Sequence, residues 1–326
     1  MVKCCEFVHG KSGMQLSLID GKLNQIIKMD SEFGSVVVLI RCVAVLLSVL
    51  STSPVMAQTS VWKVSNGTDN IYLGGTIHVL KPSDYPLPVE FNQAYEAADR
   101  LILETDIRAA QEPQGQQQIM QAMQARPEEA VDRVLTPHTY SKLMRTFGQY
   151  GLSLSSMRQF KVSMMMITLT LAEMSRLGIN QTGVDEFFLQ RAVDDGMAVG
   201  ELESFGDQIQ FIADMGKGNE ERFVTMSLTE LTETETMMEA MVASWRSGDM
   251  ASLTTIFVED MQKNYPVIYQ QLMVERNNNW VPNIEKLFNQ PGTELVLVGV
   301  GHIPGESGLI RQLEKRGYRV EPLLLK

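Results

Sequence analysis

Two short apolar runs, one near each end of the chain, stop at glycine and are followed by a histidine. Residues 71–73 lead into Gly-Gly-Thr-Ile-His78, and residues 294–298 lead into Gly-Val-Gly-His302. Apolar runs bounded by turn residues predict buried strands. Glycine at a strand end lets the backbone turn tightly or approach a ligand closely. Each run therefore reads as a strand followed by Gly-x-x-His, which places two of the four histidines where open sheets commonly bind ligands.

The pattern around the first run predicts a compact unit of strands and one helix. Alternating positions on both sides of an Asn-Gly turn predict a β-hairpin over residues 60–78. A loop over 78–85 should follow, then a helix over 88–98 with proline at its start. The apolar run 101–103 predicts another buried strand, which ends at Glu104. The order is strand, Gly-x-x-His, loop, helix, strand and acid.

The middle of the chain, about 112–290, is mostly helical in its periodicity, with one short strand candidate at 197–202 that leads to Glu203. Helices are predicted at 136–150, 160–176, 184–192, 207–215, 219–247, 250–263, 265–280 and 281–289.

The end of the chain repeats the beginning in outline. The strand 294–298 and its Gly-x-x-His are followed by a Pro-Gly loop, a helix over 307–316 and a strand over 318–322. Two βαβ-type halves thus flank a helical insertion, and an α/β fold is predicted in which both halves build one central sheet. We expect the strands of the two halves to lie side by side and to bring His78 and His302 together.

The amino-acid composition argues against some classes of binding partner. The 326 residues include 28 Lys and Arg against 39 Asp and Glu, a net charge of −11. An acidic chain without a basic block argues against nucleic acid and against an anionic membrane surface as partners. All three cysteines lie within the first 42 residues. The rest of the chain therefore has no disulfide framework and no thiolate metal site.

The N-terminal segment has the features of a targeting sequence. Residues 36–50 are apolar apart from Arg41 and Ser48, and Val-Met-Ala57 fits the small-x-small rule for cleavage. We expect residues 1–57 to be a leader and signal peptide cleaved near Ala57, which makes the protein secreted or periplasmic. The alternative is an uncleaved membrane anchor over 36–50. Membrane association is expected only through this segment.

The remaining residues, 58–326, are predicted to form a single domain in three sequential parts. Residues 58–110 carry the first half of the site, 111–290 form the helical insertion, and 291–326 carry the second half.

The candidate chemistry centres on His78, His302 and Glu104. Histidines at a sheet end can bind a metal or act as general acids and bases. A carboxylate often completes the coordination shell of a metal bound by histidines. Glu104 ends the neighbouring predicted strand and could supply that carboxylate. The alternative is that the histidines are loop residues bonded to backbone and that Glu104 is a solvated strand-end acid.

Further polar residues are weaker candidates. Glu203 provides a second carboxylate, or else it is solvated or caps a helix. Arg276 could pair with a carboxylate or bind a substrate anion, or be an arginine at a helix C-terminus. Asp185 and Glu186 after Gly183 favour a helix N-terminus, and His138 is expected at the surface.

Several segments together have a recognisable pattern: Trp62-Lys63-Val64, Tyr72-Leu73-Gly74-Gly75-Thr76-Ile77-His78, Leu103-Glu104-Thr105-Asp106, Gly183-Val184-Asp185, Leu202-Glu203, Arg276-Asn277 with Trp280, and Val298-Gly299-Val300-Gly301-His302 with Gly305 and Gly308. Over residues 60–323 this pattern resembles the TraB/GumN family, which is similar to the Tiki metalloproteases and to the bacterial pheromone-shutdown proteins. The paired Gly-x-x-His motifs with an acid after the second strand are fairly specific, whereas each segment alone is weak.

The resemblance implies a fold related to the erythromycin-esterase and ChaN-like proteins. It also implies, from the Tiki branch, a divalent-metal-dependent peptidase with His78, Glu104 and His302 as metal ligands. Manganese, cobalt and zinc all suit such a ligand set. A peptide or small-molecule substrate is expected, and the resemblance does not identify it.

A mechanism follows from the resemblance as a hypothesis. The ion would lower the pKa of bound water, and Glu203 or Glu104 would take the proton. Arg276 would stabilise the oxyanion or bind a substrate carboxylate. Gly75, Gly299 and Asn277 would support the backbone or the substrate.

Two other functions stay open. One is a metal-free, esterase-like hydrolase in which His78 activates water and Glu104 orients it. The other is a non-catalytic protein that binds or sequesters a peptide. The sequence does not determine the oligomeric state.

Overall fold

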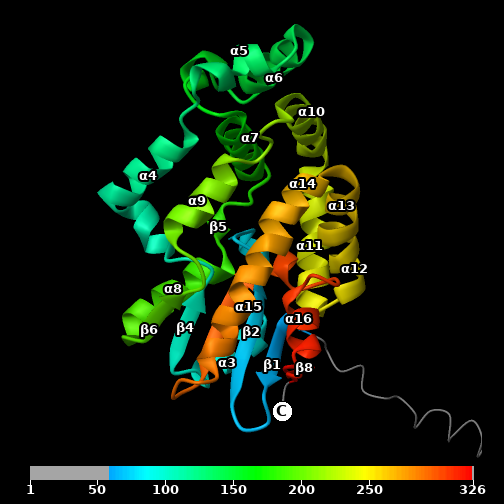
Figure 1. Ribbon diagram of the computed structural model, residues 1–326. Coiled ribbons are helices and arrows are strands. Elements are labelled where there is room, and N and C mark those ends of the chain that lie inside the picture. The colour runs from blue at the N-terminus through cyan, green and yellow to red at the C-terminus, as the bar shows by residue number, and fades with distance from the viewer. Residues whose placement is uncertain (1–58, 325–326) are drawn as a thin grey trace, which may run out of the picture. The chain divides into compact units, whose positions relative to one another are not determined.

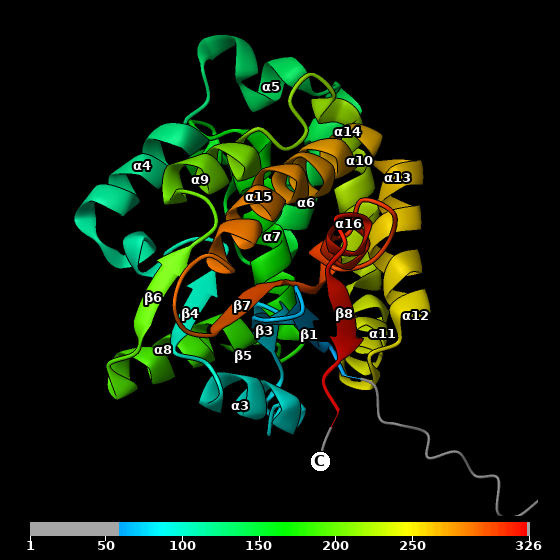
Figure 2. The ribbon, with the colours of Figure 1, turned by 60° about the horizontal axis from the view of Figure 1, so that its bottom comes forward.

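The computed structural model describes residues 59–324 (Figures 1 and 2). The predicted signal peptide over 1–57 and the alternative anchor over 36–50 lie outside these residues. Within 59–324, no helix has both the length and the apolar character needed to cross a membrane.

One six-stranded sheet organises the described residues, in the order β6-β4-β7-β2-β1-β8. Its strands are β1 (Val61–Ser65), β2 (Asn70–Thr76), β4 (Arg100–Leu103), β6 (Ala198–Glu201), β7 (Glu294–Gly299) and β8 (Arg319–Pro322). The pairs β6-β4, β4-β7 and β7-β2 are parallel, whereas β1 runs antiparallel to both of its neighbours. The predicted hairpin and the predicted α/β class are confirmed.

The two predicted βαβ units are present, but they interleave. The first is β2, α3 (Val89–Glu96) and β4, and the second is β7, α16 (Leu309–Lys315) and β8. Strand β7 lies between β2 and β4, so a strand of the second half separates two strands of the first. Gly75 of β2 pairs with Val298 of β7, and Thr76 pairs with Gly299. The two Gly-x-x-His segments therefore leave the sheet at the same edge, as the parallel layout predicts.

Helices cover both faces of the sheet because its central strands are apolar on both sides. Leu295 and Leu297 of β7 join one core, whereas Val296 and Val298 join the other. The first core is completed by α3, α8 (Val184–Asp195) and α11 (Thr234–Ser247), and the second by α15 (Arg276–Leu287) and α16.

The middle of the chain is more than a helical insertion. Strand β6 joins the main sheet, and α8, α11 and α15 cover its faces. Six helices of the middle region gather at one end of the sheet (Figure 1), and several of them share a separate apolar core. These helices are α4 (Pro113–Met123), α5 (Val131–Val134), α6 (Pro137–Gln149), α7 (Val162–Arg176), α9 (Phe205–Ala213) and α10 (Glu220–Glu230).

Three local predictions need correction. The predicted loop 78–85 contains β3 (Val79–Leu80), which pairs with β5 (Gln181–Thr182). A 3-10 turn divides the helix predicted over 219–247 into α10 and α11. The predicted boundary between the helices 265–280 and 281–289 is absent, because one helix, α15, runs from Arg276 through Pro282 to Leu287.

Two π-helical segments lie within the C-terminal helices of the middle region. One, Thr255–Glu259, joins α12 (Met250–Thr254) to α13 (Asp260–Asn264). The other, Gln270–Glu275, joins α14 (Pro266–Tyr269) to α15. Such segments are rare and frequently mark functional sites.

Candidate active site

The ends of β2, β4 and β7 meet at one edge of the sheet and border a cavity of about 310 Å³. His78 follows β2, Glu104 follows β4, and His302 follows β7. All three line this cavity, together with Arg276 and Gly299. The parallel strand layout thus brings together residues that are far apart in the sequence.

Glu104 is a buried carboxylate with a hydrogen bond to each oxygen. Its Oε1 accepts from the Gly299 amide at 2.6 Å, and its Oε2 accepts from Arg276 Nη2 at 2.6 Å and from Gln208 Nε2 at 3.0 Å. Burial opposes the charge, but His302, Arg276 and His78 outweigh it and lower the pKa of Glu104 to about 2. The side chain is therefore an anion at neutral pH and not a solvated strand-end acid.

Arg276 links the two carboxylates. It donates to Glu104 and also, through Nε and Nη2, to Glu203 at 2.6–3.2 Å. It stands at the start of α15 and is 6 % exposed, so the alternative of an arginine at a helix C-terminus is wrong. Glu203 also accepts from Trp280 Nε1 at 2.9 Å and is neither solvated nor a helix cap. Its role in this arrangement is to hold Arg276 in position.

His302 is held as a neutral imidazole with a defined tautomer. Asn277 donates to the carbonyls of His302 and Ser307, so its Oδ1 is left to accept from His302 Nδ1 at 2.7 Å. The Nε2 atom then carries the lone pair and lies 3.2 Å from Arg276 Nη1 and 3.9 Å from Glu104 Oε1. Burial lowers the pKa of His302 to about 3.

His78 is oriented by Asp185, a residue that the sequence placed only at a helix N-terminus. Asp185 Oδ2 is 2.8 Å from His78 Nδ1, and its Oδ1 accepts from the Thr76 hydroxyl at 2.7 Å. The second nitrogen, Nε2, is left for the cavity, and the imidazole is 65 % exposed at the cavity mouth. The Asp185 carboxylate raises the pKa of His78 to about 9.

Gly183 explains how Asp185 reaches this position. A Cβ at residue 183 would lie 2.2 Å from the carbonyl carbon and oxygen of His78, so only glycine permits the approach. The next amide, of Val184, donates to Ile77 O at 3.0 Å. The start of α8 is thereby fixed against the Gly-x-x-His segment, with Asp185 beside His78.

The two predicted support glycines have different surroundings. A Cβ at Gly75 would contact Val300 at 3.1 Å and Ile303 at 3.3 Å, so Gly75 makes room for the turn that carries His302. A Cβ at Gly299 would lie 3.2 Å from Glu104 Oε1, 3.4 Å from His78 Nε2 and 3.8 Å from His302 Cδ2. The space at Gly299 is therefore bounded by all three predicted metal ligands.

The donor set fits a divalent ion. Each histidine has its Nδ1 bonded to an acceptor, an arrangement typical of metal-binding histidines. His78 Nε2 is left for the cavity, whereas His302 Nε2 lies 3.2 Å from Arg276 Nη1, a contact that a bound ion would replace. Glu104 and Glu203 share the Arg276 guanidinium, and Asp185 pairs with His78, so the cluster has one carboxylate more than it has cations and a divalent cation would offset that excess. Within residues 59–324, no three His, Cys, Asp or Glu side chains already lie close enough together to hold an ion. The fit rests on the chemistry of the donors and on the space at Gly299.

Three contributors to the site were not predicted from the sequence. Asp185 and Thr76 orient His78, and Gln208 of α9 donates to Glu104. The segment Gly183-Val184-Asp185 carries a signal, because glycine permits a close approach of backbone and an acid follows two residues later. Gln208 had no such signal, since it sits in an ordinary amphipathic helix.

The sheet is mostly parallel and covered by helices on both faces, which defines an α/β protein, and a cluster of histidine, carboxylate and arginine side chains lies at its strand ends. The chain belongs to the TraB/PrgY/gumN family, whose model matches residues 60–322. It is also similar to the uncharacterized protein YbaP of Escherichia coli strain K12 and to that of Shigella flexneri. Each is 23 % identical over 249 residues, which covers 76 % of this chain and 89 % of the relative. No solved structure gave a significant match.

Proposed function

We propose that the protein is a hydrolase that cleaves an amide or ester bond, most simply in a peptide, at the cavity beside Gly299. We further propose that it uses a divalent ion held by His78, Glu104 and His302. The observation that carries the proposal is the placement of these three side chains around the space at Gly299. A bound divalent ion would supply an activated water and polarise the carbonyl that is attacked.

The protein's own groups have separate roles in this proposal. Asp185 and Asn277 bond to the Nδ1 atoms of His78 and His302 and so fix the orientations of both rings. Glu104 stays anionic because of the surrounding positive groups, as a carboxylate ligand of the ion must.

Arg276 is the nearest fixed cation to the reacting group. A guanidinium has five N–H donors, and those on Nε and Nη2 are taken by Glu104 and Glu203. Nη1 faces His302 and retains a second N–H for the developing oxyanion. Because Arg276 is buried between two carboxylates, it suits this role better than capture of a free substrate carboxylate.

A metal-free hydrolase is the second candidate, and the pair of His78 and Asp185 favours it. A general base works best when its pKa is near the working pH. The pKa of His78 is about 9, that of His302 about 3 and that of Glu104 about 2, so none is matched to neutral pH. At neutral pH His78 would be protonated and would act as an acid, not as the base that this reaction needs. The metal-dependent reaction is therefore the better supported of the two.

Turnover with and without a chelator tests the proposal. The purified protein is incubated with a library of internally quenched peptides, then treated with EDTA and resupplied with manganese, cobalt or zinc. We expect cleavage that EDTA abolishes and a metal restores, and its loss in His78→Ala and His302→Ala. His138→Ala, an exposed histidine on α6, is the matched control and should retain full activity. Cleavage that survives EDTA would point to the metal-free hydrolase, and no cleavage of any substrate would contradict both.

We also propose that the protein acts outside the cytoplasm after removal of residues 1–57, which rests on the leader sequence alone. N-terminal sequencing of the exported protein tests this. A mature chain that starts near residue 58 is expected, and recovery of the intact leader would favour the anchor.

A further inference from the structure

One wall of the cavity has a composition unlike the polar cluster that it faces. The wall is supplied by α7, by α11 and by both π-helical segments. Its side chains are Met174, Met238, Met241, Phe257, Leu272 and Met273. None carries a formal charge or a strong hydrogen-bonding group, and four of them are methionines.

The two π-helical segments bring this wall close to the catalytic edge. A Cβ at Gly301 would lie 2.9 Å from the ring of Phe257 and 3.2 Å from the methyl of Met273. Phe257 lies in the first π-helical segment and Met273 in the second. The residue after Gly301 is His302, so the apolar wall begins directly beside the group proposed to hold the ion.

The charged groups of the cavity are already paired with one another. Asp185 is occupied by His78 and Thr76, and Arg276 by Glu104 and Glu203. A charged substrate side chain placed against the wall would lose its hydration without gaining a partner, which costs several kcal/mol. An apolar side chain would gain from the same transfer, by about 25 cal/mol per Å² buried.

We infer that this cavity selects substrates with a large apolar side chain next to the bond that is cleaved. The inference rests on the proposed function for the position of that bond. A volume of about 310 Å³ is at the lower end of ligand pockets and suits one side chain with its adjoining backbone. Methionines are flexible and adapt to different apolar shapes, so the selection is for a class and not for one residue.

Met238 lines this cavity and a second one. It is 4 % exposed, and the second cavity has a volume of about 250 Å³. Lys81 and Glu239 line that second cavity, and their side chains pair at 3.5 Å. Shortening Met238 would join the two spaces, and the variant should then accept larger side chains than the parent.

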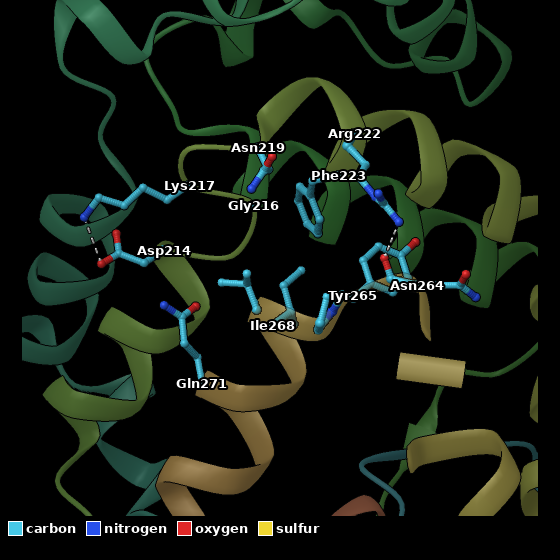
Figure 3. A pocket seen from close by; sticks show the side chains of 12 residues that line it. Asp214, Gly216, Lys217, Asn219, Arg222, Phe223, Asn264, Tyr265, Ile268 and Gln271 are labelled. Carbon is cyan, nitrogen blue, oxygen red and sulfur yellow. Dashed lines mark hydrogen bonds and ion pairs between the residues drawn. The ribbon is translucent and has the colours of Figure 1, made fainter. Parts of the chain in front are cut away.

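A third cavity, in the helical region, lacks these features. It has a volume of about 130 Å³, and Figure 3 shows Ile268 and Phe223 among its lining residues. The two cations that line it are paired with other lining residues, since Lys217 pairs with Asp214 and Arg222 donates to Asn264 O. It contains none of the proposed catalytic residues and serves as a reference for unspecific apolar binding.

The test is a titration of protein labelled with ¹³C at the methionine methyl groups. The probes are two peptides, acetyl-Ala-Ala-Leu-Ala-amide and the same peptide with Asp in place of Leu. We expect the Leu peptide to shift the methyls of Met174, Met238, Met241 and Met273, with an affinity at least about tenfold above that of the Asp peptide. The methyl of Met144, 51 % exposed on α6, is the internal reference and should not move.

Turnover of the same peptides separates this inference from the proposed function. Methyl shifts without cleavage would support the apolar pocket and contradict the hydrolase. Cleavage of both peptides at equal rates, or the absence of selective methyl shifts, would overturn the inference. Met238→Ala should extend cleavage to a naphthylalanine peptide, whereas Met238→Leu, which conserves volume, should retain the parent's preference. An unchanged preference in a folded Met238→Ala variant would also overturn the inference.

Discussion

Replacing Gly299 with alanine places one methyl group in the space that the three proposed ligands surround. The backbone at Gly299 has φ −51° and ψ 134°, values that any L-residue adopts without strain. Its amide would still donate to Glu104. The substitution therefore changes the contents of the site while leaving the fold and the main-chain hydrogen bond in place.

The expected stability change is small. An alanine in a compatible conformation stabilises a protein by about 0.4–1 kcal/mol, because the unfolded chain loses freedom. The new methyl would lie 3.2 Å from Glu104 Oε1, a tight contact that displaces its neighbour by a few tenths of an ångström. That displacement costs about 1 kcal/mol. The two effects nearly cancel, so the free energy of unfolding should change by less than about 1 kcal/mol.

The functional change should be large by comparison. Disturbing the groups around a bound ion typically weakens its binding by about 10–100-fold, and a methyl between the ligands should do at least as much. The assays are urea unfolding and calorimetric titration with manganese, cobalt and zinc. Gly148→Ala, near the end of α6 with nothing within 4 Å of its Cβ, is the control. It should gain up to about 1 kcal/mol in stability and bind metal normally. Normal metal affinity in a folded Gly299→Ala variant would refute the assignment of this space to the ion.

Three further predictions address the charged groups. Asp185→Asn should bring the pKa of His78 down from about 9 toward its ordinary value, measured by NMR titration of the metal-free protein; an unchanged pKa would mean that Asp185 is not the cause. Arg276→Met should cost about 3–5 kcal/mol in urea unfolding, because Glu104 and Glu203 lose their cation, and adding Glu203→Gln should recover part of that loss. A loss below about 1 kcal/mol would count against a buried network. The pKa of Glu104 is lowered to about 2, so its ionisation stabilises the fold fully above its ordinary pKa near 4.5 and progressively less as pH falls toward 2. The stability difference between wild type and Glu104→Gln should accordingly shrink over this window, and a pH-independent difference would disprove it.

The central part of the fold could be predicted because its strands carry strong local signals. The apolar runs at residues 71–73, 101–103 and 294–298 stop at glycine or acid, and parallel strands must present these ends at the same edge. His78, Glu104 and His302 were grouped on this basis, and the structure brings them to one cavity. The sequence does not give the order of strands, because the interleaving of β7 between β2 and β4 depends on packing across the whole sheet.

The partners of the site residues could not be predicted, since they depend on tertiary distances. Asp185 and Gln208 look like ordinary helix residues in sequence, yet one orients His78 and the other donates to Glu104. Arg276 follows the π-helical segment Gln270–Glu275, and its bond to Glu203 joins residues 73 positions apart, which no local pattern predicts. Short strands such as β3 escaped prediction because two residues carry no periodicity.

Elemental mass spectrometry of the purified protein tests the central claim most directly. The account predicts about one divalent ion per chain after incubation with manganese, cobalt or zinc and dialysis. The ion should be lost in His78→Ala and in His302→Ala, and retained in His138→Ala. A parent protein that binds none of the three metals, or histidine variants that bind as much as the parent, would contradict the claim that these residues form one metal site.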